Sequence, residues 1–164
     1  MSIWYRGSNA QDPLAMREDG NGTERYGPGI YFFDREDFAE GYGPVHAYRI
    51  NVKDNWFVTP RSRVADYYQS ALKWIKRAPD YEDTLSYWGE NPDKAMRAAA
   101  RALIDTEDPV DFYLSIWYEF YRKYPKEFMD SAVKAGVSGL RVDWSEEAKV
   151  LVLYDTSLAR ELKR

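Results

Sequence analysis

The residues of this chain with the clearest chemical potential lie in the stretch RYGPGIYFFDREDFAEGYG, residues 25–43. Gly27 and Gly29 can adopt positive φ angles and Pro28 has a restricted φ, so this turn allows the backbone to lie close to a ligand or to another segment. The aromatic run that follows predicts a strand over 30–33. An ordinary turn and strand without a chemical role is the alternative interpretation.

Histidine, cysteine and the common nucleotide and hydrolase motifs offer no competing site. His46 is the one histidine and the chain has no cysteine, so the nitrogen and sulfur ligands of a zinc site are missing and His46 is interpreted as a structural residue. Neither a phosphate-binding G-x-x-x-x-G-K-[ST] loop nor a G-x-S-x-G motif occurs. Phe32 stands where G-x-G-x-x-G would need its third glycine, which disfavours a doubly wound dinucleotide-binding fold.

Composition and charge indicate a single cytoplasmic domain. The chain has 164 residues, of which 45% are hydrophobic, enough to bury one core without disulfides or metal ions. The sequence begins without a signal-peptide pattern, and no apolar run approaches the roughly 20 residues that cross a bilayer. We therefore expect no membrane partner. The net charge of −4 disfavours nucleic acid as a partner.

Strands are expected near both ends of the chain and helices between them. The first half has strand patterns in SIWYRGS, GPGIYFF and VHAYRINVKDNWFVTP, and a short helix through residues 35–41 with Asp34 as its cap. SGLRVDW and KVLVLYD predict two more strands near the end, joined by an acidic turn with Ser145, Glu146 and Glu147. The order of strands, helices and strands predicts one α+β domain with a helical insertion over about 61–135.

Apolar residues at helical spacing predict the helices of this insertion. Val64, Tyr68, Leu72 and Ile75 form one stripe. Further helices are predicted to begin at Asn91–Pro92 and Asp108–Pro109, to break at Pro125 and to end at Gly136. The many Tyr and Trp residues of the insertion are interpreted mainly as core, with a partner-binding surface as the alternative.

Three segments together resemble the signature regions of the ADP-ribosyltransferase superfamily. They are WYRGS, GPGIYFFDREDFAEGYG and AGVSGLRVDWSEEAKVLVLYD. Members commonly show a first strand with His or Arg beside Gly-Thr or Gly-Ser, then G-x-G-x-Y-F and a helix, then a late strand with a catalytic Glu. The layout also resembles the small phage anti-CRISPR ADP-ribosyltransferases. The resemblance covers residues 2–58 and 136–158, and it implies split antiparallel β-sheets around a cleft that holds NAD.

The resemblance also implies which residues bind the cofactor NAD. Tyr31 matches the aromatic position that flanks the nicotinamide ring, where a cation above an aromatic face gains about 0.5 to 2 kcal/mol. Arg6 matches the basic position that orients NAD, because a guanidinium can form two parallel hydrogen bonds to a phosphate. Tyr42 is expected either as a second wall or as a core residue. The implied cofactor-binding residues are Arg6, Gly7, Ser8, Gly29, Tyr31, Phe33 and Tyr42.

The catalytic carboxylate implied by the resemblance falls in the acidic turn. It would stabilise the positive charge that develops on the ribose as the nicotinamide bond breaks. Relatives often have this Glu directly before the hydrophobic strand, whereas here Val150 begins that strand after EEAK. Glu147, Glu146 and Asp143 therefore all remain candidates, and solvated surface carboxylates are the alternative.

The function implied by the resemblance is mono-ADP-ribosyl transfer from NAD to a protein acceptor, as in a phage or bacterial effector that inactivates a host defence protein. An NAD glycohydrolase would use the same cleft with water as acceptor. A non-catalytic protein-binding inhibitor would keep the fold without turnover. The sequence does not identify the acceptor, because acceptor choice depends on loops and surfaces outside the matched motifs.

Overall fold

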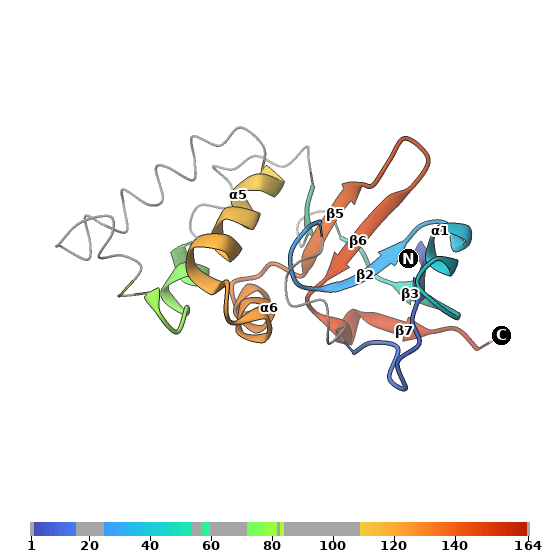
Figure 1. Ribbon diagram of the computed structural model, residues 1–164, viewed down its shortest axis with the longest axis horizontal. Coiled ribbons are helices and arrows are strands. Elements are labelled where there is room, and N and C mark those ends of the chain that lie inside the picture. The colour runs from blue at the N-terminus through green and yellow to red at the C-terminus, as the bar shows by residue number, and fades with distance from the viewer. Residues whose placement is uncertain are drawn as a thin grey trace.

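A computed structural model of the chain describes residues 2–15, 25–53, 57–59, 72–81, 83 and 109–163, with the backbone alone for Pro109 and Phe112. Within these residues the fold combines one seven-stranded sheet with a small number of helices, so the α+β class predicted from the order of segments is confirmed. Figure 1 shows the sheet at one end of the molecule and helices α5 and α6 at the other.

The sheet has the strand order β4-β5-β6-β2-β1-β3-β7 and is antiparallel except for the β4–β5 pair. Its strands are β1 Ser2–Gly7, β2 Ile30–Phe33, β3 Val45–Ile50, β4 Phe57–Val58, β5 Gly139–Asp143, β6 Lys149–Leu153 and β7 Ala159–Glu161. The segments predicted as strands all contain one, and β7 is an additional edge strand that pairs with β3. β5 and β6 form a hairpin that projects from the body of the sheet (Figure 1).

Of the neighbouring strands in the sheet, β1 and β2 share the fewest paired residues in the described part of the chain. β1 pairs with β2 through Tyr5 and Phe33 alone within the described strands. In contrast, β2 pairs with β6 along its whole length, and β1 pairs with β3 from one end to the other. Beyond the Tyr5–Phe33 pair, the Arg6 guanidinium donates to the Tyr31 carbonyl at 3.1 Å, which satisfies a backbone group that a longer strand pair would have satisfied.

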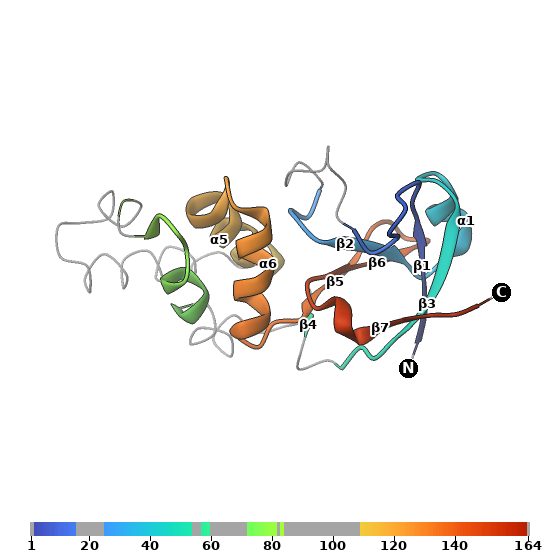
Figure 2. The same ribbon diagram turned by 90° about the horizontal axis from the view of Figure 1, so that it is seen from below.

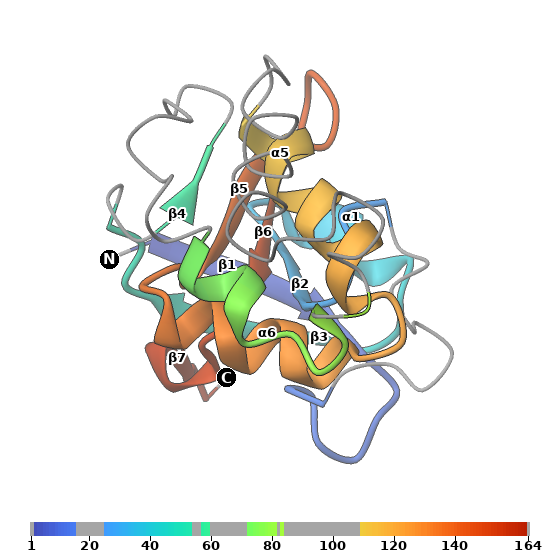
Figure 3. The same cartoon turned by 90° about the vertical axis from the view of Figure 1, so that its left-hand side faces the viewer.

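Both faces of the sheet are buried because side chains alternate between two apolar clusters. One face contributes Phe33, Leu140, Val142, Val150 and Val152 to the core shared with the helices. The opposite face carries the second cluster: Trp4, Ile30, Phe32, Tyr48, Ile50, Phe57, Leu151 and Leu153. Figure 3 shows the helices in front of the strands, consistent with their packing on the first face.

Two of the helices that pack on this face begin at a proline, and a glycine follows the end of the last one. They are α5 Pro109–Ile116, the π-helix η3 Trp117–Tyr121 and α6 Pro125–Lys134. Pro125 begins α6 after the break, and Gly136 follows it with φ of +90°, a conformation that favours glycine after a helix end. Residues 72–76 are also helical. The predicted Val64–Tyr68 part of that stripe and the helix from Asn91 lie outside the described residues.

The remaining helix, α1 Glu36–Glu40, lies beside β1 and β3 at the opposite end from α6 (Figure 2). The prediction that Asp34 caps this helix is wrong. The residue at the cap position is Arg35, which makes no capping hydrogen bond with its side chain. The Asp34 carboxylate instead accepts the Lys149 backbone N–H at 2.8 Å, and the Asp34 N–H donates to the Lys149 carbonyl at 3.1 Å. Asp34 therefore extends the β2–β6 pairing rather than ending a helix.

None of the helices within the described residues is long and apolar enough to cross a membrane.

Removal of the buried Tyr154 hydroxyl, which is among several buried polar side-chain atoms of the core without a described hydrogen bond, should stabilise the fold. Tyr154 is 5% exposed, and its hydroxyl has no hydrogen-bond partner among the described residues. Burial raises the pKa of Tyr154, so the unpaired group stays neutral and desolvated. We expect Tyr154→Phe to raise the free energy of unfolding in urea by about 1 kcal/mol. Tyr121→Phe is the matched control with the opposite sign, because the Tyr121 hydroxyl donates to the Trp74 carbonyl; equal changes for both variants would contradict this account.

Candidate functional site

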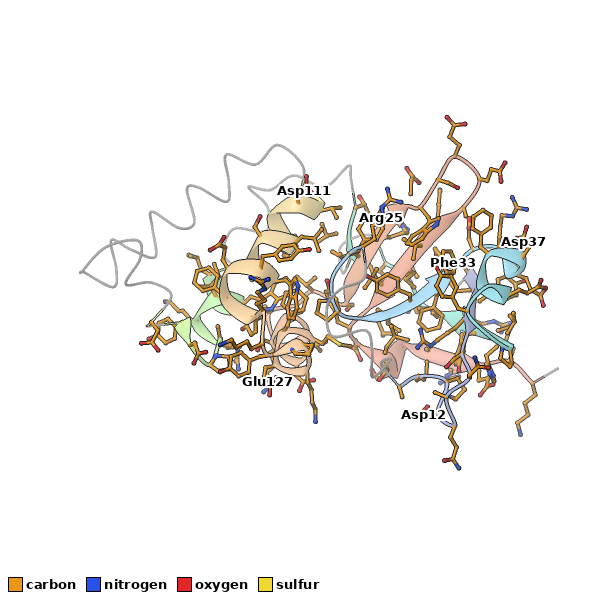
Figure 4. The ribbon with its side chains drawn as sticks, in the orientation of Figure 1. Asp12, Arg25, Phe33, Asp37, Asp111 and Glu127 are labelled. Atoms are coloured by element: carbon orange, nitrogen blue, oxygen red, sulfur yellow. The ribbon has the colours of Figure 1, made fainter. Side chains whose placement is uncertain are left out.

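A pocket of about 170 Å³ opens on the helix-packed face of the sheet, next to the place where β1 and β2 separate. Its lining comes from β1, the turn before β2, β2 itself, the segment after α1 and the β5–β6 hairpin. The lining residues are Arg6, Gly7, Arg25, Gly29, Tyr31, Phe33, Tyr42 and Trp144. Figure 4 shows Arg25 and Phe33 on the sheet side of the molecule, apart from Asp111 on α5 and Glu127 on α6.

The Gly-Pro-Gly turn before β2 is held tightly against its neighbours. Gly27 has φ of +75° and Gly29 has φ of +154°, both in the region that favours glycine. The Tyr31 hydroxyl donates to the Gly27 carbonyl at 2.7 Å and accepts the Tyr26 N–H at 3.0 Å. The turn therefore bends back so that the ring of Tyr31 closes it and faces the pocket.

Arg6 is mainly a structural residue of this pocket. It is 4% exposed, and its guanidinium donates to the carbonyls of Pro13, Ala15 and Tyr31. These bonds fasten the segment after β1 to the start of β2. They engage all three nitrogens of the guanidinium and three of its five N–H groups, so its main described role is to hold the backbone.

Aromatic rings form the wall of the pocket. Phe33 and Tyr42 are stacked with centroids 5.6 Å apart and planes at 19°. Phe33 also meets Trp144 edge to face at 5.4 Å. Such ring pairs are favourable beyond their area of burial and hold each other in place. Tyr42 is thus a wall residue, which is one of the two roles that its sequence context allowed.

A cation stands at this aromatic wall. The Arg25 guanidinium lies 5.4 Å from the centroid of Trp144 and 5.3 Å from that of Tyr26, and it donates to the Trp144 carbonyl at 3.1 Å. Tyr26 meets Trp144 edge to face at 6.2 Å, and its hydroxyl donates to the Asp143 carbonyl at 3.1 Å. The turn and the hairpin are therefore joined across the side of the pocket.

Gly7 lines the pocket, whereas Ser8 shapes the neighbouring turn. A Cβ added at Gly7 would lie 1.9 Å from the Ala39 carbonyl oxygen, so the glycine is needed for α1 to pack on β1. Ser8 is 5% exposed, its hydroxyl accepts the Ala10 N–H at 3.1 Å, and it does not line the pocket. Ser8 shapes the turn after β1 rather than the pocket surface.

The three candidate carboxylates do not line the pocket. Glu146 and Glu147 are exposed in the turn between β5 and β6, where the backbone N–H groups of Trp144 and Ser145 both donate to the Ala148 carbonyl. Oε2 of Glu147 lies 3.9 Å from Nη1 of Arg35. Asp143 ends β5 and lines a separate pocket of about 420 Å³.

Arg35 links Glu147 to the aromatic wall. Its guanidinium lies 5.3 Å from the centroid of Phe38, and Phe38 packs at 6.1 Å on Phe33. Of the three candidates, Glu147 is therefore the one whose side chain is connected through described contacts to a pocket residue, whereas Asp143 is connected through its backbone carbonyl, which accepts from Tyr26. The Arg35–Glu147 ion pair is exposed and contributes little stability by itself.

His46, interpreted from the sequence as a structural residue, makes a contact between two strands of the sheet. Its Nδ1 lies 3.0 Å from Oε1 of Glu161, which joins β3 to the edge strand β7. Within the described residues, no group of three His, Asp or Glu side chains is arranged to hold a metal ion.

The structure brings together six of the seven residues that the resemblance implied for the cofactor, Ser8 being the exception. Sequence reasoning missed Arg25 and Trp144, which also line the pocket. Arg25 stands two residues before Gly27 and could have been chosen as the cation nearest the turn. Trp144 is the last residue of SGLRVDW, the segment predicted as a strand, and its alternation with Val142 could have placed it on the same face.

Comparison of the chain with protein-family models, with curated proteins and with solved structures finds no match.

Tyr31 is expected to affect ligand binding and the turn in separable ways. On the expectation from the sequence that Tyr31 flanks the nicotinamide ring of NAD, Tyr31→Ala should weaken NAD binding more than Tyr31→Phe does, because alanine removes the ring face that would contact the ligand. Tyr31→Phe loses two hydrogen bonds of the turn and should lower the free energy of unfolding by about 1 to 2 kcal/mol. Titration calorimetry and urea unfolding measure the two effects, and equal losses of affinity would contradict the stacking role.

Proposed function

We propose that this chain is a mono-ADP-ribosyltransferase that binds NAD with the nicotinamide end in the aromatic pocket and transfers ADP-ribose to a protein. The observation that supports the proposal is the common pocket of residues that stand far apart in the sequence. The resemblance implied a cofactor role for positions 6, 7, 29, 31, 33 and 42, and all six line it. Positions 6, 29 and 42 come from three separate segments, which supports the proposal.

The size of the pocket suits one heteroaromatic ring. Its volume of about 170 Å³ is close to the roughly 150 Å³ of a cavity that holds benzene. A dinucleotide is far larger, so the nicotinamide enters and the remainder lies across the open side. The walls are the ring faces and edges of Tyr31, Phe33 and Trp144, a surface that favours a flat ring.

The charge of the pocket surface suits an oxidised pyridine nucleotide. Aromatic faces attract a cationic ring, and Arg25 attracts the phosphate on the same molecule. NAD contains both groups, whereas NADH has a neutral ring. We therefore propose that binding depends on the oxidised form, by roughly twofold to thirtyfold from the cation–aromatic attraction.

Glu147 is the proposed catalytic carboxylate. In the reaction the bond between the ribose carbon and the nicotinamide nitrogen breaks, and its electron pair leaves with nicotinamide. The acceptor side chain then donates an electron pair to the ribose carbon and loses a proton. A carboxylate near the ribose stabilises the intervening positive charge. The Arg35 guanidinium is bound to Asp37 by hydrogen bonds of 3.1 and 2.6 Å. Its Nη1 lies 3.9 Å from Glu147, so it would attract this carboxylate toward the Phe33 side of the pocket.

A non-catalytic NAD-binding module is the second candidate function. It is favoured by one specific observation, that no carboxylate lines the pocket among the described residues. In that case NAD or ADP-ribose binding would control an interaction with another protein, without cleavage of the nicotinamide bond.

Two measurements distinguish these functions. Calorimetric titration with NAD and with NADH tests binding and its dependence on the charged ring. Incubation with NAD labelled in the adenylate part, in a bacterial lysate, then separates labelled protein from free ADP-ribose. Label in protein supports the transferase, free ADP-ribose alone supports a glycohydrolase, and tight binding without either product supports the module. Absence of NAD binding overturns all three.

A further inference from the structure

The pocket contains two guanidinium groups, and they differ in what they are able to bind. Arg6 is almost fully buried, and its hydrogen bonds to the carbonyls of Pro13, Ala15 and Tyr31 hold these backbone groups in place. Moving it onto a ligand would leave those buried carbonyls without donors, which is costly. Arg25 is exposed and makes one hydrogen bond, to the Trp144 carbonyl, among the described residues. Arg25 is thus the guanidinium that is available to a ligand.

Ring contacts hold Arg25 in a defined position without using its hydrogen-bond donors. The rings of Tyr26 and Trp144 lie 5.3 and 5.4 Å from the guanidinium carbon, and these contacts restrict the side chain to the edge of the pocket. Aromatic faces do not use the N–H groups at the guanidinium rim, so within the described part of the chain those beyond the bond to Trp144 are open to solvent or to a ligand. A preorganised cation with unused donors is suited to an anionic group with several oxygens.

The geometry points to Arg25 as the residue that binds the phosphate of the nucleotide in the pocket, the role that the resemblance had implied for Arg6. The inference rests on the proposed function, because it takes a nucleotide to be the ligand. A ring in a pocket of this size leaves the attached sugar and first phosphate at the opening, where Arg25 lines the wall. The guanidinium then forms charge-assisted hydrogen bonds with the phosphate oxygens.

Pairs of ligands that differ by one phosphate test this role. Nicotinamide mononucleotide and nicotinamide riboside share the ring and sugar, and AMP and adenosine form a second pair without nicotinamide. We expect wild-type protein to bind the mononucleotide about tenfold more tightly than the riboside in calorimetry, as a charge-assisted hydrogen bond permits. Arg25→Gln should remove this difference and leave riboside affinity unchanged. Arg25→Lys should keep part of it, because the charge stays and the fork is lost.

Arg49→Gln is the matched control, since Arg49 is an exposed arginine on β3 that does not line the pocket. It should keep the full preference for the phosphate-bearing ligand. Retention of that preference in Arg25→Gln, or an equal loss of affinity for both members of a pair, overturns the role of Arg25. If neither nicotinamide compound binds but AMP is preferred over adenosine in an Arg25-dependent way, the proposed function fails and the phosphate site stands. If none of the four compounds binds, both fail.

Discussion

Glu147→Gln is expected to lower turnover of NAD about a hundredfold or more, while the affinity for NAD changes little. Glutamine keeps the size and the hydrogen-bonding capacity of the side chain but lacks the negative charge that the ribose requires as the nicotinamide bond breaks. Release of nicotinamide from NAD, measured under single-turnover conditions, gives the rate without knowledge of the acceptor. Calorimetry on the same variant gives the affinity.

Glu146→Gln is the matched control, because Glu146 is an equally exposed neighbour in the same turn. Residues 144–147 are bends rather than extended chain, so the alternation of a strand does not decide which glutamate faces the pocket. The contact of Glu147 with Arg35 is the reason to favour it. If Glu146→Gln is the inactive variant, Glu146 is the catalytic residue and the contact with Arg35 does not identify it. If both variants turn over NAD as the wild-type protein does, either Asp143 is the catalytic carboxylate or, where none of the three proteins releases nicotinamide, the chain is the non-catalytic module.

The positions of the pocket residues could be predicted from the sequence because they depend on local chemistry. Gly27 and Gly29 predict a turn with positive φ, and the aromatic run after them predicts a strand. Tyr31 and Phe33 lie on one face of that strand because side chains alternate between its two faces. The same reasoning predicted the break at Pro125 and the helix end at Gly136. Each of these features is determined within a few residues.

The roles of several residues depend on contacts between distant segments, which the sequence does not specify. Arg6 donates to carbonyls of the segment after β1 and to the Tyr31 carbonyl. A residue that resembles a cofactor ligand therefore joins two backbone segments by hydrogen bonds. Asp34 has the ideal type and position for a helix cap, yet the Lys149 N–H, 115 residues away, binds its carboxylate. Asp34 binds a backbone N–H of a distant strand instead of capping the helix, and Arg6 binds backbone carbonyls, which its resemblance to a cofactor ligand did not indicate.

The missed edge strand β7 has a similar cause. Ala159–Glu161 has too few residues and too little apolar alternation to be recognised as a strand alone. It forms because β3 offers an unpaired edge, and the His46–Glu161 contact fixes its end. A strand of this kind is specified by its neighbour.

Gly29→Ala is expected to lower the free energy of unfolding by about 2 to 4 kcal/mol, the sum of an unfavourable φ and a steric overlap. Gly29 has φ of +154°, and an added Cβ would lie 2.3 Å from Cγ1 of Val152. Val152 is fully buried on β6, so it cannot turn away. Urea unfolding followed by tryptophan fluorescence measures the loss. Gly41→Ala is the control, because Gly41 has φ of −63° and its nearest neighbour is 3.8 Å away, so its stability should stay the same or rise by up to about 1 kcal/mol.

A double-mutant cycle separates the two parts of the Gly29→Ala effect. In a Val152→Ala background the Cγ1 atom is gone, so the added methyl group has room and only the unfavourable φ remains. Gly29→Ala should then cost less than in the wild-type protein, by about 1 kcal/mol or more. The same cost in both backgrounds would mean that the backbone conformation alone requires glycine here. A reduced cost would show that β2 lies against β6 at a separation only glycine permits, which places Tyr31 and Phe33 in the wall of the pocket.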